Sequence, residues 1–183
     1  MNDVIKSRRT IHEYLPKKVD EDLILNTLQT SLWAPNHKLT NPTRFYMVGV
    51  EKRMELVDLA LKIKSEKGFD VNVELVGKVK KKFLNPSHLV IITQNLSPDP
   101  VTEKEDYANI ACVVYNISLL LWPHGIGSKW STGPIIKRPE IYKICGINPQ
   151  IERIEGLIRM GYPDKIKAPI ARPELNTILK RLP

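Results

Sequence analysis

The stretch Tyr107-Ala-Asn-Ile-Ala-Cys-Val-Val-Tyr-Asn-Ile-Ser-Leu-Leu-Leu-Trp122 is the most apolar part of this 183-residue chain. It belongs to a helix that we expect from Glu103 to Trp122, which Pro123 and Gly125 would end. Apolar residues occupy nearly every side of this helix, so the pattern predicts burial on nearly all sides. Few helices of a chain this short can be so enclosed, and we therefore expect part of its surface to lie at a subunit interface.

The same stretch does not have the pattern of a membrane span. Polar residues interrupt it, among them Asn109 and Ser118, and its length is at or below the roughly 17–25 residues that cross a bilayer. The N-terminal residues 1–9 lack the apolar core of a signal peptide. The two cysteines, Cys112 and Cys145, are too far apart for a C-x-x-C pair, which argues against a thiolate metal site or a disulfide scaffold. We therefore expect a cytoplasmic protein with free thiols and no membrane partner.

Helices alternate with strands on both sides of the apolar stretch. The mass of 20.9 kDa, with 42% apolar and 26% charged residues, fits one globular domain over residues 1–183. Strands mostly separated by helices indicate an α/β or α+β fold with one central sheet. We expect strands at 44–50, 88–93, 126–132 and 154–162, and further helices at 20–32, 51–64, 72–83, 139–146 and 173–182.

The net charge of +8 favours an anionic partner without identifying it. Nucleic acid, an acidic membrane surface and a phosphorylated cofactor all fit this charge. Lys78, Lys80, Lys81 and Lys82 form a basic run with little aromatic interleaving. We interpret the run as the solvated outer face of an amphipathic helix, because nucleic-acid binding requires more than such a run.

Two polar clusters precede the first strand. Ser7-Arg8-Arg9-Thr10 offers two planar guanidiniums and a hydroxyl to an anion such as a phosphate; the alternative is a solvated basic turn at a helix end. The second cluster, Trp33-Ala-Pro-Asn-His-Lys38, lies in a loop between a helix and a strand, where binding groups often occur. His37 could donate to a ligand carbonyl there, or the loop could simply end the helix.

Two more clusters follow the apolar stretch. The glycines of Gly125-Ile-Gly-Ser-Lys-Trp-Ser-Thr-Gly133 permit close backbone approach to a heterocycle. This is not a G-x-G-x-x-G fingerprint, because Trp130 occupies a glycine position, and a helix-to-strand turn is the alternative. The last cluster is Arg159-Met-Gly-Tyr-Pro163, and the basic residues that follow it include Arg172. A turn whose lysine side chains lie along apolar surface explains this cluster without a function.

The chain shows no pattern of catalytic side chains. The histidines at 12, 37, 88 and 124 have no metal-ligand spacing, and no G-x-S-x-G nucleophile elbow is present. We therefore predict no metal site and no obligatory catalytic residue. If the protein is an enzyme, a cofactor carries its chemistry.

Taken together, the four clusters resemble the FMN-dependent nitroreductase family, especially its short single-domain members. The family's Ser-Arg-Arg-Ser motif is similar to Ser7-Arg8-Arg9-Thr10. The family segment that leads into Gln-Pro-Trp-Arg-Phe is similar to Ala34-Pro35-Asn36-His37-Lys38, with Pro42 and Phe45. Gly125-Ile-Gly-Ser-Lys-Trp130 is similar to Gly-Leu-Gly-x-x-Trp, and Gly161-Tyr162-Pro163 to Gly-Tyr-Pro. The likeness covers nearly all of the chain in one register.

The resemblance implies an α+β fold with a central mixed β-sheet flanked by helices, in an intertwined homodimer. It implies FMN at the dimer interface, reduced by NAD(P)H and reoxidised by a small-molecule acceptor such as a nitroaromatic or a quinone. By position, Arg8, Arg9 and Thr10 would hold the FMN phosphate, with a second contact from Arg172. The isoalloxazine would be lined by Trp130, Ser131 and Thr132 of the same subunit and by Trp33 and His37 of the partner chain.

Two alternatives stay open at this point. One is a flavin-binding protein of the same fold that acts as a carrier, a sensor or a flavin-consuming enzyme. The other, more distant, is a basic nucleic-acid-binding module. Flavin colour after purification distinguishes a flavoprotein from a nucleic-acid-binding module. Bleaching of that colour by NAD(P)H then distinguishes a reductase from a flavin-binding protein that is not reduced.

Overall fold

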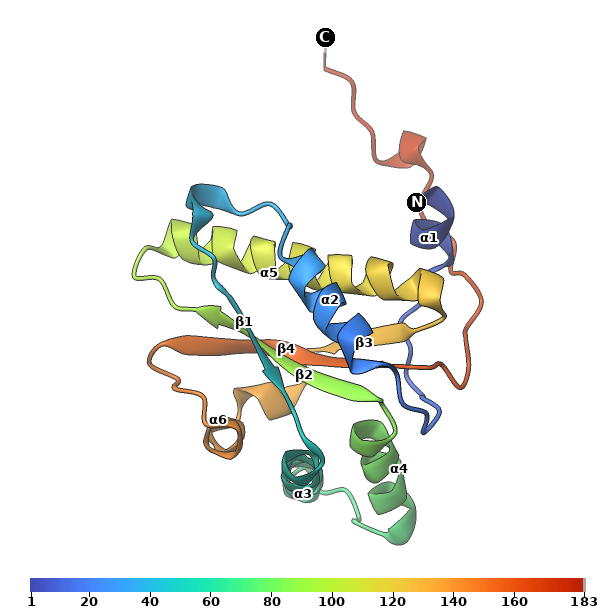
Figure 1. Cartoon of the computed structure of the whole chain (residues 1–183), viewed down its shortest axis with the longest axis vertical. Coiled ribbons are helices and arrows are strands. Elements are labelled where there is room, and N and C mark those ends of the chain that lie inside the picture. The colour runs from blue at the N-terminus through green and yellow to red at the C-terminus, as the bar shows by residue number, and fades with distance from the viewer. Residues whose placement is uncertain (183) are drawn as a thin grey trace.

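The computed structural model describes residues 1–182 and contains a four-stranded sheet with helices on both faces (Figure 1). Each expected strand is present, with ends displaced by a few residues. The elements are α1 (Asn2–Ser7), α2 (Glu21–Ser31), η1 (His37–Leu39), β1 (Thr43–Met47), α3 (Val50–Glu66), α4 (Val73–Leu84), β2 (His88–Asn95), α5 (Pro100–Leu121), η2 (Trp122–His124), β3 (Gly127–Ser131), η3 (Pro134–Lys137), α6 (Pro139–Cys145), β4 (Glu152–Gly161) and η4 (Leu175–Thr177).

The strand order is β1-β2-β4-β3, and every neighbouring pair is antiparallel. The expectation of a mixed sheet is therefore wrong for these strands. The reason lies in the last strand: β2 and β3, joined through α5, do run in the same direction, but β4 inserts between them. Within the described chain, parallel pairing is limited to an isolated bridge between Thr10 and Ser128.

The two faces of the sheet carry separate hydrophobic clusters, which confirms the α+β fold. Side chains alternate along each strand, so neighbouring residues enter opposite clusters. Val90 and Ile92 of β2 pack with Ile117 of α5 on the face that α2 and α5 cover (Figure 1). Leu89 and Ile91 pack with the helices on the other face, α3, α4 and α6.

Helix α5 is buried on most sides but not on all. Asp99 caps it by accepting hydrogen bonds from the backbone N–H groups of residues 101 and 102. Ala108, Cys112 and Tyr115, spaced four and three residues apart, form an exposed stripe on this helix. The stripe is a surface that a second molecule could cover, and the expected subunit interface on this helix stays a prediction.

The chain after the sheet is extended and exposed from Asp164 to Leu182 (Figure 1). The expected helix at 173–182 is wrong, because only the single turn η4 forms there. Its apolar residues Leu175, Ile178 and Leu182 have no core to pack against within this chain. A helix that short is marginal without packing. No helix within residues 1–182 combines the length and apolarity needed to cross a membrane.

Candidate functional site

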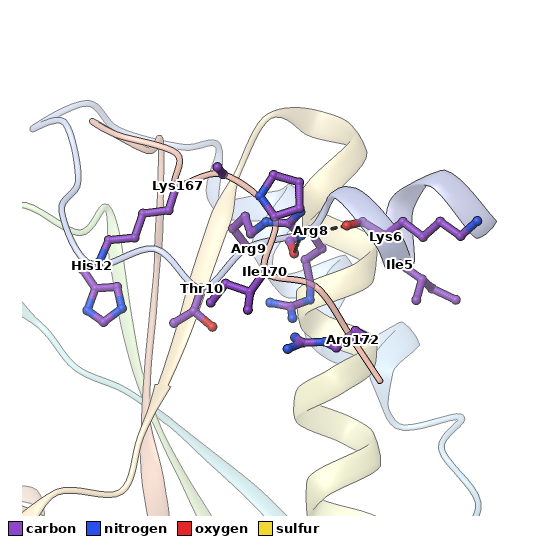
Figure 2. Close-up of a pocket in the computed structure, with 11 residues that line it drawn as sticks. Ile5, Lys6, Arg8, Arg9, Thr10, His12, Lys167, Ile170 and Arg172 are labelled. Atoms are coloured by element: carbon purple, nitrogen blue, oxygen red, sulfur yellow. Dashed lines mark hydrogen bonds between the residues drawn. The ribbon is translucent and has the colours of Figure 1, made fainter. Parts of the chain in front are cut away.

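A cavity of about 550 Å³ lies between α1, the segment that follows it and the C-terminal segment (Figure 2). We call it the anion cavity. It brings together four residues predicted from the sequence, Arg8, Arg9, Thr10 and Arg172. Lys6, His12 and Lys167 also line it, and none of its lining residues is acidic.

The two neighbouring arginines have different surroundings. Arg9 donates from Nη1 to the carbonyl oxygens of Lys6 and Arg8, at 2.7 and 2.6 Å, and so helps to end α1. The guanidiniums of Arg8 and Arg172 point toward the same part of the cavity (Figure 2). Within residues 1–182, no ion pair joins any of these arginines to a carboxylate. The Nε of Arg8 is buried without a partner, which leaves the site ready for an anion.

The segment that carries the arginines lies directly against β3. Ile11 donates its backbone N–H to the carbonyl of Ser128 at 3.1 Å. Gly127 makes this approach possible, because a Cβ there would lie 2.1 Å from Cγ1 of Ile11. Gly127, from the cluster at 125–133, therefore allows the segment that follows Ser7-Arg8-Arg9-Thr10 to lie against β3.

A second cavity of about 620 Å³, which we call the basic cavity, continues from His12 toward α4. Its cationic lining includes Lys81, Lys82, Lys129 and Arg159. Lys129 Nζ lies 2.9 Å from Nδ1 of His12. Burial, followed by repulsion from neighbouring cations, lowers the pKa of both His12 and Lys129.

Arg159 is the most unusual residue of this cavity. It is 2% exposed, its Nε has no hydrogen-bond partner, and within residues 1–182 no carboxylate pairs with it. Its guanidinium carbon lies 5.7 Å from the centre of the Phe83 ring. Burial lowers the pKa of Arg159 to about 10. A buried cation without a counter-charge is costly, and an anionic ligand would supply the missing charge.

The lysine run of α4 borders this cavity, and all four of its lysines are exposed, as the interpretation of a solvated helix face expects. Lys78, Lys81 and Lys82 line the basic cavity, whereas Lys80 lines none of the cavities described here. Although the Lys82 side chain is exposed overall, desolvation, followed by repulsion from Arg159 and Lys129, lowers its pKa to about 8.

The residues predicted around the isoalloxazine divide between the two faces of the sheet. Trp130 packs on the α5 face, where its ring lies 6.4 Å from that of Tyr107 and its Nε1 donates to the Glu155 carbonyl at 3.1 Å. Ser131 faces the α4 side, and its buried Oγ has no partner. Thr132 is exposed at the end of β3. The structure therefore does not bring Trp130 and the arginines into one cavity of this chain.

His37 lies at the far end of α5 from the anion cavity, whereas Trp33 lies beside the middle of this helix, because the carbonyls of Ser31 and Pro35 accept hydrogen bonds from Asn116 and Asn109. His37 Nε2 is 3.8 Å from a carboxylate oxygen of Glu105, near the start of α5, and Trp33 is 86% exposed. Ser7 accepts a hydrogen bond from Trp122, just past the end of α5. The 17 helical steps from Glu105 to Trp122 span about 25 Å, so His37 is out of reach of this chain's own anion cavity, and Trp33 does not line that cavity.

The loop that carries these two residues is held firmly in an unusual conformation. Asn109 of α5 donates to the Pro35 carbonyl at 2.8 Å, and Thr40 donates to the buried Asp106. Lys38 and Leu39 have φ of 53° and 52°, which non-glycine residues rarely adopt. Such strain often accompanies a functional loop.

Sequence reasoning assigned no site role to His12, Lys82 or Lys129, and Arg159 began the fourth cluster without being assigned a role. The one available signal was that side chains on a strand point to alternate faces of the sheet, which places Lys129 of β3 and Arg159 of β4 on the face covered by α4. In addition, no group of three or more histidine, cysteine, aspartate or glutamate residues within 1–182 could hold a metal ion.

Known proteins resemble this chain over most of its length. The model of the Nitroreductase family matches residues 5–162. The chain is 29% identical over 167 residues to "Putative NAD(P)H nitroreductase YfhC" of Bacillus subtilis (strain 168), covering 90% of this chain and 85% of that protein. A solved nitroreductase-like family protein from Bacillus cereus superimposes with a TM-score of 0.84 at 27% identity, covering 99% of this chain and 95% of that one. The FMN-dependent nitroreductase NfnB from Mycobacterium smegmatis, solved in complex with NADPH, gives 0.79 at 15% identity, covering 100% and 97%.

Proposed function

Since the chain belongs to the nitroreductase family, we propose that it is an FMN-dependent oxidoreductase. It takes reducing equivalents from NAD(P)H and passes them to a small organic acceptor such as a nitroaromatic or a quinone. The observation that carries the proposal is a run of cationic side chains from the anion cavity through His12 to Arg159, beside which Glu13 and Asp164 are the acidic lining residues. Within residues 1–182, no carboxylate pairs with its arginines.

The anion cavity fits the phosphate of FMN. A dianionic phosphate accepts several charge-assisted hydrogen bonds, and planar guanidiniums suit its oxygens. Arg8 and Arg172 point into the cavity, and Thr10 adds a hydroxyl. Arg9 is half committed to the end of α1, so we assign it the role of holding Arg8 in place as much as that of binding the phosphate.

The α4 side of β3 fits the flavin ring. Ser131 faces this side with a buried Oγ that has no partner, whereas Ser128 faces α5, where its Oγ donates to that of Ser118 at 2.9 Å. Lys129 and Arg159 lie on this face. When bound, FMN would accept a hydride from the nicotinamide and pass electrons to the acceptor. Fixed cations beside the ring would stabilise the negative charge of its reduced form without an acid or base side chain.

We assign Trp33 and His37 to the flavin site of a second subunit. Within one chain, about 25 Å of α5 separates His37 from the anion cavity, and Trp33 is exposed beside the middle of that helix. Their loop is nevertheless held rigidly, as a binding loop would be. The Ala108–Cys112–Tyr115 stripe and the extended segment 164–182 provide apolar surface for an intertwined homodimer.

An anaerobic titration tests the proposed reaction. The purified protein, supplied with FMN, should hold about one flavin per chain, and NADH or NADPH should bleach the 450-nm flavin band without oxygen. Reoxidation by a nitroaromatic or a quinone should restore the band. A protein that takes up no FMN refutes the proposal, and one that binds FMN but is never bleached is a flavin carrier or sensor instead.

Mixing two defective variants tests the shared site. Arg8→Ala and His37→Ala are each expected to impair FMN binding. If the two residues serve one site from different chains, a mixed dimer has one site with both lesions and one with neither. Native tight binding should then return to half of the sites. Mixed dimers, verified by mass spectrometry, that recover no tight site would contradict the assignment.

A further inference from the structure

Two lysines of α4, Lys78 and Lys81, line the basic cavity outside the proposed flavin face. The neighbouring Lys82 lines both the basic cavity and a smaller cavity of about 310 Å³ beside Ser131. Lys78 and Lys81 line the basic cavity but not the smaller one. The binding of the flavin ring against β3 therefore leaves these two lysines without a role.

The two lysines are placed to bind one anion together. Residues three apart on a helix are neighbours on its surface, so Lys78 and Lys81 lie one turn apart on one side of α4. Val79 and Phe83 are buried in the core on the other side of the helix. Helix α4 is thus a fixed base that carries two exposed, mobile ammonium groups.

The acidic residues nearby do not balance this charge. Five lysines and arginines line the basic cavity, against the two carboxylates of Glu13 and Asp164. Within residues 1–182, Lys81 has no ion pair, and Lys78 pairs with Glu74 alone. The Lys78 and Glu74 side chains are 70% and 74% exposed. Such an exposed pair is weak, so it can open to an incoming anion.

The two nicotinamide reductants differ in one anionic group. NADH and NADPH share the nicotinamide and the diphosphate, and only NADPH carries a 2′-phosphate on its adenosine ribose. A phosphate monoester has a charge of about −1.5 to −2 at pH 7, and lysine binds phosphate as a point charge. The phosphate of FMN is assigned to Arg8 and Arg172 in the anion cavity, so the lysines of α4 remain for a second phosphate.

We propose that Lys78 and Lys81 bind the 2′-phosphate of NADPH and thereby make NADPH the preferred reductant over NADH. The inference rests on the proposed function, because it specifies the reductant of that reaction. Lys81 makes the stronger contact, since Lys78 is shared with Glu74.

Binding of two adenosine nucleotides tests the phosphate site without turnover. Adenosine 2′,5′-bisphosphate carries the 2′-phosphate, and AMP lacks it. Calorimetry on the FMN-loaded protein should show the bisphosphate binding about tenfold more tightly, as two exposed charge pairs together would give. Lys81→Gln should weaken bisphosphate binding about three- to fivefold and Lys78→Gln about two- to threefold. AMP binding should change by less than about twofold in both variants.

Steady-state kinetics supplies a second readout. In the wild type, kcat/KM should favour NADPH over NADH about tenfold, and the double variant Lys78→Gln/Lys81→Gln should lose most of this preference. Glu74→Gln releases Lys78 and removes a negative charge, so it should raise the preference about twofold. Lys80→Gln is the matched control, because it removes the same charge from α4 outside the basic cavity. An unchanged preference in this control separates a local site from the overall positive field.

The possible failures are distinguishable. Equal kcat/KM of the wild type for NADH and NADPH overturns the inference, although the proposed function stands. If Lys81→Gln weakens NADH and NADPH alike, the lysines hold the shared diphosphate and the inference is wrong. A protein that binds FMN but is reduced by neither nucleotide refutes the proposed function, whereas equal binding of the two adenosine nucleotides refutes the phosphate site itself.

Discussion

Replacing Gly127 by alanine should destabilise the protein and disturb its anion cavity. The added Cβ would lie 2.1 Å from Cγ1 and 3.0 Å from Cβ of Ile11, and 3.2 Å from Cγ of Pro163. Ile11 is fully buried, and its backbone N–H is bonded to Ser128. The segment cannot move aside without losing that bond and its packing.

The expected cost combines two effects. Overpacking of a core typically costs about 1–3 kcal/mol, and a lost or stretched hydrogen bond adds about 1 kcal/mol. The smaller unfolded-state entropy of alanine offsets about 0.4–1 kcal/mol. We therefore expect the free energy of unfolding to fall by about 1–3 kcal/mol, which lowers Tm by roughly 2–12 °C for a chain of this size.

Urea denaturation of the apo protein measures this effect, and FMN titration measures the displacement of Arg8 and Arg9. Gly77→Ala is the matched control, because its Cβ would meet nothing within 4 Å and its helix should gain about 0.5–1 kcal/mol. Gly127→Ala should also bind FMN more weakly, whereas Gly77→Ala should not. A Gly127→Ala protein as stable as the wild type would refute the close approach of Ile11 to β3.

Two further predictions concern α4 and the strained loop. The pKa of Lys82 is lowered from 10.5 to about 8 in the folded apo protein. Between these pH values the unfolded chain therefore binds more protons than the folded one, so stability should rise with pH. Lys82→Met should reduce this rise, measured as Tm against pH, and an unchanged slope of Tm against pH would contradict the lowered pKa. Asn109→Ala removes the partners of the Pro35 carbonyl and the Thr43 hydroxyl. This substitution should lower the free energy of unfolding, measured by urea denaturation, by about 1–3 kcal/mol. It should also speed the hydrogen exchange of the backbone amides of residues 35–43, and unchanged exchange would show that other contacts hold the loop.

Local sequence patterns were sufficient to predict most of the fold. The apolar stretch at 107–122 identified α5, and Pro123 with Gly125 marked its end. Short apolar runs gave the four strands. Their pairing could not be predicted, because the insertion of β4 between β2 and β3 depends on contacts distant in sequence. The helix expected at 173–182 failed for a related reason, since its apolar residues find no packing partner within this chain.

The candidate site was predictable where its residues are neighbours in the sequence. Arg8, Arg9 and Thr10 came from one cluster, and the structure adds Arg172 to the same cavity. Arg159 began one of the four clusters but was assigned no site role, because its position in a strand does not by itself indicate burial without a counter-charge. Only the fold shows that it is buried and unpaired. The assignment of Trp33 and His37 to a second subunit stays a prediction.

The central claim is that the anion cavity holds the phosphate of FMN. Titrating the flavin-free protein with FMN and with riboflavin, which lacks the phosphate, tests it most directly. Two charge-assisted hydrogen bonds of about 1.5–3 kcal/mol each predict that FMN binds at least about 100-fold more tightly. Arg8→Ala should weaken FMN binding about tenfold or more and leave riboflavin binding unchanged. Equal affinities of the wild-type protein for FMN and riboflavin would contradict the account.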